Sequence, residues 1–183
     1  MRRGFTMIQR KYLLLIAISG FIIAIDQIVK LYVHTHFQLH ESIPVIKDFF
    51  NLTYVPNTGA AFGIFKDSHE IFRTIFFMSM PPIACLIILF ILRTVPDHDK
   101  IQIYALSGVF GGAIGNYIDR IRLGFVVDYL DFHIKNKYAW PAFNVADSTI
   151  VVGIGILMYL MYKEGQEEKA KKKAQQAQSQ AKA

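Results

Sequence analysis

Four long apolar runs constrain this chain more than any other feature of its sequence. They cover residues 12–33, 74–92, 101–118 and about 143–162 of the 183 residues. A helix needs roughly 20 mostly apolar residues to cross a bilayer, because each residue adds about 1.5 Å along the helix axis. The middle two runs contain no charged residue. We therefore predict an all-α membrane protein with four transmembrane helices.

The positions of lysine and arginine predict which way these helices face. Four basic residues precede the first run, which lacks a small-residue cleavage site at its end and is expected to be retained rather than removed as a signal peptide. Six more lie from Lys163 onward. Cytoplasmic flanks carry an excess of lysine and arginine. We therefore expect both termini in the cytoplasm, with residues 34–70 and 119–142 as the two outer loops.

Residues 163–183 form a low-complexity end rich in lysine, glutamine, alanine and glutamate. No apolar stripe is wide enough to pack, so we predict a solvated, charged cytoplasmic tail that is disordered or helical, near anionic lipid headgroups. No aromatic residue lies between these lysines, as a nucleic-acid-binding segment would require. The net charge of +6 is therefore interpreted as a topology signal, and no nucleic-acid partner is expected.

The first outer loop is too apolar to be plain solvent-exposed chain. Residues 43–65 include Leu52, Tyr54 and several β-branched residues, which predict short strands broken at Pro56 and Gly59. We expect a small sheet lying on the outer membrane surface. The polar, amphipathic residues 66–73 predict a short surface helix leading into the second span.

Given this orientation, the unusual polar residues gather at one level, the outer ends of the helices. They are Asp26, Lys30, Asn57, Asn116, Asp119, Arg120, Asp128, Asp131, Asn144 and Asp147. Independent spans would not require such clustering, and acids at the edge of a membrane span are costly enough to indicate function. The pattern predicts one site at the outer membrane boundary.

Several of these residues also have structural interpretations. Asp26 and Lys30 are spaced i,i+4 and can form an ion pair that anchors the first helix, or they can contact a substrate. Asp119 is followed by Arg120 and preceded by Asn116, which predicts a structural pair. Asp131 is expected to be a solvated loop residue.

Two remaining groups of residues are expected to have structural roles. The turn at Asn57 and Gly59 is flanked by small residues that let another backbone approach closely. Glycines at positions 108, 111, 112 and 115 predict close helix packing in the third span.

Asp128 and Asp147 are the two acidic residues that could act together in catalysis. Both have mainly apolar neighbours and no adjacent cation, and they lie on separate segments. Two carboxylates that meet share a proton, so that one serves as acid and the other as base, as hydrolysis by an aspartic protease requires. Asn144, three residues before Asp147, can orient it. Such a pair needs no metal or cofactor, and the histidines lack the spacing of a ligand set.

Five ordered blocks then resemble lipoprotein signal peptidase (signal peptidase II), an aspartic protease family of the bacterial cytoplasmic membrane. The blocks are Asp26-Gln27-Ile28-Val29-Lys30, Asn57-Thr58-Gly59-Ala60-Ala61-Phe62-Gly63, the stretch 111–120 ending in Asn116-Tyr117-Ile118-Asp119-Arg120, Val126-Val127-Asp128-Tyr129, and Phe143-Asn144-Val145-Ala146-Asp147. The resemblance implies that Asp128 and Asp147 are the catalytic pair. It assigns supporting or substrate-binding roles to Asp26, Lys30, Asn57, Gly59, Asn116, Asp119, Arg120 and Asn144.

The resemblance also implies the reaction and the architecture. The substrate would be a prolipoprotein with a diacylglyceryl-modified cysteine, cut just before that cysteine in the inner membrane. Residues 1–162 would form a single peptidase domain, working as a monomer, and the outer sheet would be a cradle for the lipoprotein. Two alternatives stay open from the residues alone: a small proton-coupled transporter, and a non-enzymatic assembly factor whose polar residues join helices.

Overall fold

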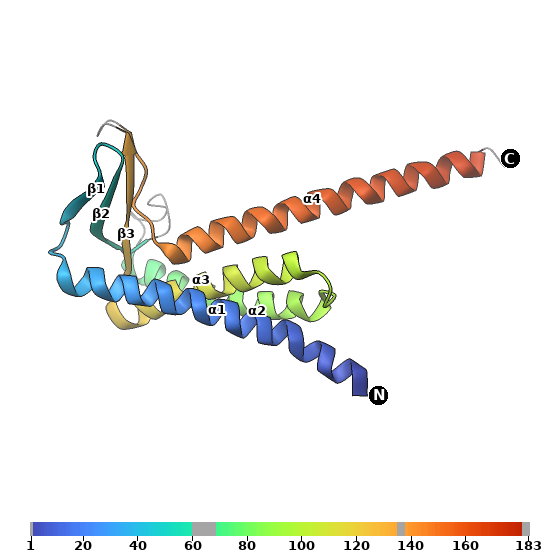
Figure 1. Ribbon diagram of the computed structural model, residues 1–183, viewed down its shortest axis with the longest axis horizontal. Helices are drawn as coiled ribbons and strands as arrows, with labels where there is room; N and C mark the ends of the chain where they lie inside the picture. Colours follow the sequence, from blue (N-terminus) through green and yellow to red (C-terminus); the bar gives the residue numbers. More distant parts are fainter. Residues whose placement is uncertain (1, 60–68, 135–137, 181–183) are drawn as a thin grey trace.

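The computed structural model describes residues 2–59, 69–134 and 138–180. In these ranges a bundle of helices carries a small sheet at one end (Figure 1). The helices are α1 (Arg2–His36), α2 (Glu70–Thr94), α3 (Lys100–Leu123) and α4 (Val145–Gln180). The strands are β1 (Ser42–Ile46), β2 (Phe50–Asn57), β3 (Val126–Ile134) and β4 (Tyr138–Ala139).

Three of the helices are long and apolar enough to cross a membrane. These segments are Arg10–His36, Ile71–Thr94 and Val145–Gln176. Large apolar side chains on them face outward, including Phe21, Phe90 and Val151, which are 67%, 71% and 70% exposed. Outward-facing apolar side chains are expected where lipid, rather than water, surrounds a helix.

Helix α3 lies at the centre of the bundle and packs against each of the other three helices. Its glycines make this possible. A Cβ atom on Gly112 would lie 2.5 Å from the carbonyl oxygen of Ala146, and one on Gly111 would lie 2.9 Å from the Cα of Ser19. The prediction of close helix packing by small residues is therefore confirmed.

The sheet is antiparallel, with strand order β1-β2-β3-β4. Two differences from the sequence prediction stand out. Pro56 does not break a strand, because it lies inside β2 and pairs with Val127 of β3. The second outer loop is shorter than expected, because α3 continues to Leu123, ends at Gly124 with φ of 81°, and leads straight into β3.

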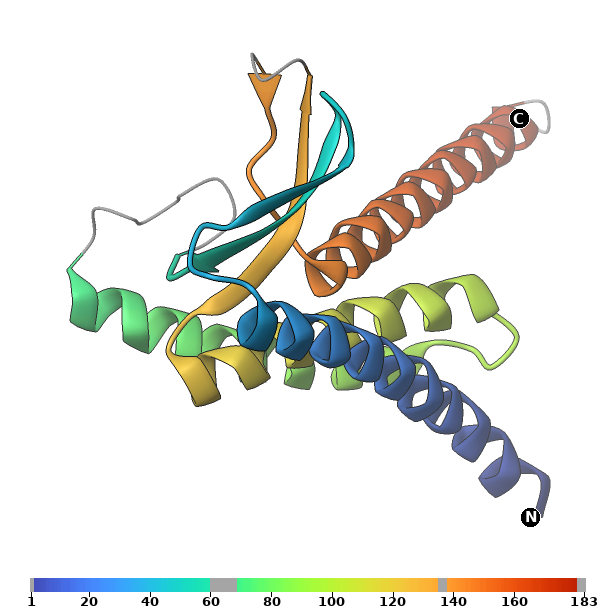
Figure 2. The same ribbon diagram turned by 60° about the vertical axis from the view of Figure 1, so that its left-hand side comes forward.

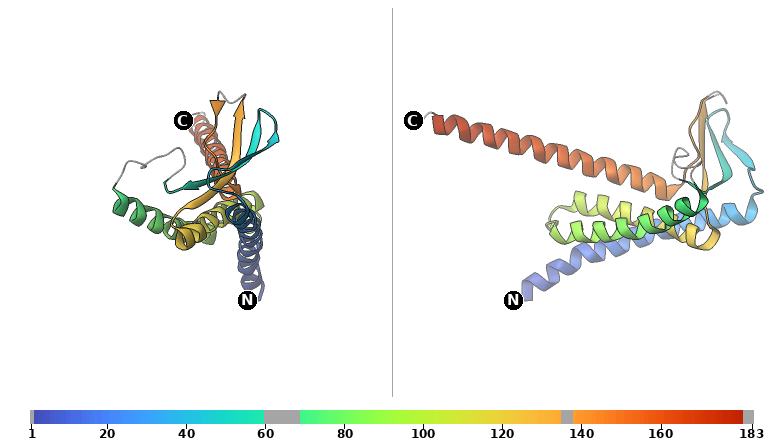
Figure 3. Two further views of the ribbon diagram at one scale, coloured as in Figure 1. Left: turned by 90° about the vertical axis from the view of Figure 1, so that its left-hand side faces the viewer. Right: turned by 180° about the vertical axis from the view of Figure 1, so that it is seen from behind.

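The end of the chain is helical, which is one of the two forms expected for the tail. Helix α4 continues without interruption through Gln180, well beyond the rest of the bundle (Figures 1 and 3). Alanine, glutamate, lysine and glutamine are strong helix formers, which explains a solvated helix here. The predicted surface helix falls partly on residues 60–68, outside the described residues. Residues 70–73 belong to the first turn of α2.

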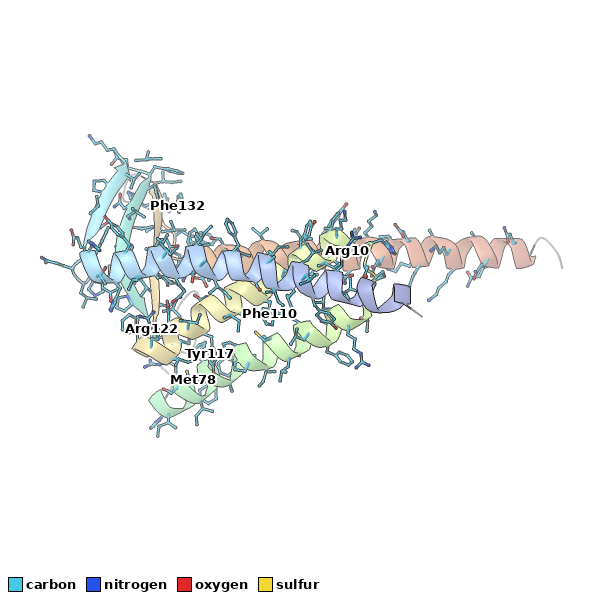
Figure 4. The ribbon with its side chains drawn as sticks, turned by 60° about the horizontal axis from the view of Figure 1, so that its bottom comes forward. Arg10, Met78, Phe110, Tyr117, Arg122 and Phe132 are labelled. Atoms are coloured by element: carbon cyan, nitrogen blue, oxygen red, sulfur yellow. The ribbon has the colours of Figure 1, made fainter. Side chains whose placement is uncertain are left out.

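The bundle has two different ends. Both chain termini and the connection between α2 and α3 lie opposite the sheet (Figure 1). Figure 4 shows the same polarity, with Arg10 toward one end and Phe132 on the sheet at the other. Near the termini, the buried Lys11 joins α1 to α2, since its ammonium donates to the carbonyl oxygens of Arg93 and Val95 at 2.9 and 2.8 Å. Near the sheet, polar side chains fill the interior instead.

Candidate active site

Asp128 and Asp147 reach the same pocket from different elements. Asp128 lies on β3, where it pairs with Val55 of β2, and Asp147 lies in the first turn of α4. Figure 2 shows β3 passing beside the start of α4. Both aspartates line a cavity of about 910 Å³ between the sheet, the segment that leads into α4, and α4 itself. The structure thus brings together the two carboxylates that the sequence singled out.

Two asparagines hold the Asp128 carboxylate. The Asn57 amide donates to Oδ2 at 2.8 Å, and the Asn144 amide donates to Oδ1 at 2.7 Å. Asp128 is only 2% exposed. Burial first, and then the negative charge of Asp147, raise the pKa of Asp128 to about 7, against the two hydrogen bonds and Lys30, which lower it. The carboxyl therefore takes up and releases a proton near neutral pH.

Asn144 connects the two aspartates. It is the residue before α4, and its side-chain oxygen accepts the backbone N–H of Asp147 at 2.8 Å, as a helix N-cap does. The other end of the same amide donates to Asp128. Asp147 in turn accepts a hydrogen bond from the Asn116 amide at 2.7 Å. The position of one carboxylate relative to the other is thus set by the cap of α4.

The first turn of α4 is held by two further elements. The backbone N–H of Ala146 donates to Oδ1 of Asp26 in α1 at 2.9 Å, and the N–H of Val145 donates to the Tyr129 hydroxyl at 3.2 Å. The first N–H groups of a helix have no partner within it, so these contacts satisfy them. The role of Tyr129 was missed from sequence, although it directly follows Asp128.

A buried charge cluster lies behind the two aspartates. The Lys30 ammonium is 2.8 Å from Oδ2 of Asp26 and 3.1 Å from Oδ2 of Asp119. Asp26 and Lys30 are 0% and 2% exposed. Of the two possibilities left open by their spacing, the structure shows the ion pair. Gln27, which the sequence analysis did not single out, donates to Asp119 at 2.8 Å and lies in the first of the five blocks.

The predicted pair between Asp119 and Arg120 is wrong. Asp119 points inward, where it binds Lys30 and accepts the backbone N–H of Val127 at 3.1 Å. Neighbouring residues on a helix point about 100° apart, because 3.6 residues make one turn. The Arg120 guanidinium therefore points elsewhere, donating to the carbonyl oxygen of Gly59 at 3.3 Å and lying over the ring of Phe77, 5.2 Å from its centroid.

The side chain of Asn57 closes the turn that runs from Asn57 to Gly59. The Asn57 oxygen accepts the backbone N–H of Gly59 at 3.0 Å, which leaves the amide nitrogen free to donate to Asp128. Asp131 lies on β3 rather than in a loop, lines the same cavity, and has an oxygen 4.0 Å from Nδ1 of His133.

Comparison with known proteins gives a consistent result. Residues 18–163 match the family described as signal peptidase (SPase) II. The lipoprotein signal peptidase of Syntrophus aciditrophicus is 42% identical over 160 residues, covering 87% of this chain and 99% of that protein. The one from Desulforapulum autotrophicum is 45% identical over 142 residues, covering 78% and 87%.

A solved structure described as a bacterial membrane enzyme, determined by the in meso method, superposes with a TM-score of 0.74. It is 31% identical and covers 82% of this chain and 88% of that one. The fold and the sequence therefore agree, and the resemblance carried by the five blocks is confirmed. This chain, an integral protein of the bacterial inner membrane, belongs to the signal peptidase II family.

Proposed function

We propose that this protein is an aspartic endopeptidase that removes the signal peptide from prolipoproteins, cutting before a cysteine that carries a diacylglyceryl group. Family membership supports the reaction. The meeting of Asp128 and Asp147 in one large cavity is the observation that carries the assignment of the site. The transporter alternative finds no support among the similar proteins.

The two aspartates supply the acid and the base of the hydrolysis. At a pH below about 7 the pair holds one proton, because burial raises the pKa of Asp128 to about 7. The ionised carboxyl takes a proton from water, whose oxygen attacks the carbonyl carbon of the scissile bond. The protonated carboxyl gives its proton to the carbonyl oxygen. When the C–N bond breaks, a carboxyl returns a proton to the amine of the modified cysteine.

The surrounding residues hold this geometry. Asn57, Asn116 and Asn144 donate to the two carboxylates, and Asn144 also caps α4. The cluster of Asp26, Lys30 and Asp119 fixes α1, α3 and α4 to one another. We assign these residues supporting roles, since their side chains are buried behind the cavity. Arg120 and Gly59 shape its edge.

The cavity suits an apolar substrate that arrives from the membrane. Its lining is mostly apolar and includes Pro56, Trp140, Phe143, Ile150 and Val151. Val151 is 70% exposed on the outer face of α4. A signal helix and acyl chains can therefore approach laterally along α4 while the scissile bond reaches the aspartates.

This function sets the orientation of the protein in the membrane. We propose that α3 is the fourth transmembrane helix, enclosed by the other three, and that residues 1–162 form one monomeric peptidase domain. Both termini then face the cytoplasm, and the sheet lies at the outer surface as a cradle for the lipoprotein. The sheet and both aspartates lie at the same end of the bundle, which supports this arrangement.

The test is cleavage of a purified diacylglyceryl-modified prolipoprotein by the Asp128→Asn and Asp147→Asn proteins. Each variant is expected to insert into the membrane and to lose cleavage, because the one remaining carboxyl cannot serve as acid and base at the same time. Asp48→Asn, on the turn between β1 and β2 and outside the cavity, serves as the control and should cleave normally. Normal processing by either site variant would contradict the assignment.

A further inference from the structure

Lys30 is linked to Asp147 through one intervening side chain, that of Asn116. Its ammonium is 2.8 Å from Oδ2 of Asp26, 3.1 Å from Oδ2 of Asp119 and 2.8 Å from the side-chain oxygen of Asn116. An ammonium has three hydrogens to donate. One of them is donated to Asn116, two carboxylate oxygens lie within ion-pair distance of the ammonium, and Lys30 is only 2% exposed. Lys30 is therefore buried among these three oxygens and does not line the cavity.

The ammonium determines which way the Asn116 amide faces. The amide oxygen accepts from Lys30 and also from the Asn144 amide at 3.2 Å, and the amide nitrogen donates to Asp147 at 2.7 Å. If the amide turned over, its NH₂ group would face two donors and its oxygen would face a carboxylate. Unpaired polar groups of this kind are costly when buried. The present orientation is thus the only one that satisfies all the partners.

We infer that Lys30 is a positioning residue for the cleavage reaction, holding the Asn116 amide so that it donates a hydrogen bond to Asp147. This inference rests on the proposed peptidase function. Lys30 acts through Asn116 and touches neither substrate nor scissile bond. Its role in the ion cluster and its role in the reaction are separate, and they can be measured separately.

Several charged groups face Asp147, and the experiment must keep the net charge around it constant. They are Lys30 from α1, Arg120 from α3 and Asp128 from β3, and the ammonium of Lys30 is in turn paired with Asp26 and Asp119. Replacing Lys30 alone would leave two buried carboxylates without their cation, which is strongly destabilising. Replacing Lys30 and Asp119 together by neutral residues removes one positive and one negative charge. The net charge of the cluster then stays the same.

The experiment compares Lys30→Met/Asp119→Asn, Asn116→Ala and the triple combination in the full-length protein, with a diacylglyceryl-modified prolipoprotein as substrate. Loss of a hydrogen bond to a charged group should lower kcat by about 10- to 100-fold in each of the first two proteins. KM should not change. The acid limb of the pH profile should move up by about one pH unit, because the ionised pair loses a donor. The triple variant should be no slower than Asn116→Ala.

Lys11→Met is the matched control. Lys11 is also a buried lysine of α1 and donates to two backbone carbonyl oxygens of the protein, but it lies toward the opposite end of the helix. This variant should melt at a lower temperature and keep the wild-type kcat and pH profile. Losses that multiply in the triple variant would overturn the inference, as would wild-type kcat in the Lys30 variant.

If the Lys30 variant fails to insert, Asn116→Asp tests whether the hydrogen bond from residue 116 to Asp147 supports cleavage. Aspartate has the shape of asparagine and can accept from Lys30, but it presents an oxygen instead of an N–H group to Asp147. We expect an inserted protein whose kcat is lowered at least as much as in Asn116→Ala. Wild-type activity would overturn the inference. An inactive wild-type protein would instead refute the proposed function.

Discussion

Asn57→Ala tests whether hydrogen bonding to Asp128 sets the pH range of cleavage. The Asn57 amide is one of two donors to this carboxyl, at 2.8 Å, and both carboxylate oxygens are occupied. A hydrogen bond to a charged group contributes about 1.5–3 kcal/mol. Since one pKa unit corresponds to about 1.4 kcal/mol, losing it should raise the pKa of Asp128 by roughly one to two units from about 7.

The direction of the effect follows from the shared proton. The active pair holds one proton, and activity is lost on the alkaline side when that proton leaves. Asn57→Ala destabilises the ionised carboxylate, so the proton is held more tightly. The alkaline limb of kcat/KM should therefore move from near pH 7 to roughly pH 8–9, even if the maximum rate falls because the turn at Gly59 loses its hydrogen bond.

The assay is the pH dependence of prolipoprotein cleavage in detergent micelles, with Asn51→Ala as the control. Asn51 lies on the same strand, but its amide donates to Ser42 at 2.9 Å and it does not line the cavity. Its profile should match that of the wild type. An alkaline limb that stays in place in Asn57→Ala, or moves to lower pH, would refute the link between this hydrogen bond and the ionisation of the pair.

Two further predictions concern stability. A Cβ atom on Gly115 would lie 2.7 Å from Oδ2 of Asp26, so Gly115→Ala should lower the melting temperature and reduce the free energy of unfolding by about 1–3 kcal/mol. Gly155→Ala, with nothing within 4 Å of the new atom, should leave the melting temperature unchanged or raise it slightly. Equal effects of the two substitutions would argue against close packing at Gly115. Because the pKa of Asp128 is about 7 in the folded protein and 3.8 otherwise, its stabilising contribution is complete at acid pH and is lost as pH rises toward 7. Thermal unfolding should therefore show Asp128→Asn gaining stability over the wild type between pH 4 and 8, and a constant difference would contradict the raised pKa.

The helices and the two aspartates were predictable from sequence because their signals are local. An apolar run of membrane-spanning length identifies a helix without knowledge of its neighbours. Asp128 and Asp147 stood out because each has apolar neighbours and no adjacent cation. Small residues at fixed spacing on the third run likewise predicted the close contacts of α3.

The partners of these residues were not predictable, because they depend on pairing between distant segments. Adjacency suggested that Asp119 pairs with Arg120, but its cation is Lys30, which comes from another helix. The strand β3 was missed since its pairing with β2 is set by a register that sequence alone does not reveal. Tyr129 lies beside Asp128 in the sequence, but only the position of α4 gives its hydroxyl a function.

The contact between Asp26 and Ala146 has a consequence for how the enzyme is made. It joins residues 120 positions apart, and the pocket also needs Asn57, Asn116 and Asp128 from the segments between them. During synthesis, the pocket is therefore incomplete until the last helix, α4, has been inserted into the membrane. Under the proposed assignment, a chain that lacks α4 also lacks Asp147, so cleavage can begin only after the last helix has packed against α1 and α3.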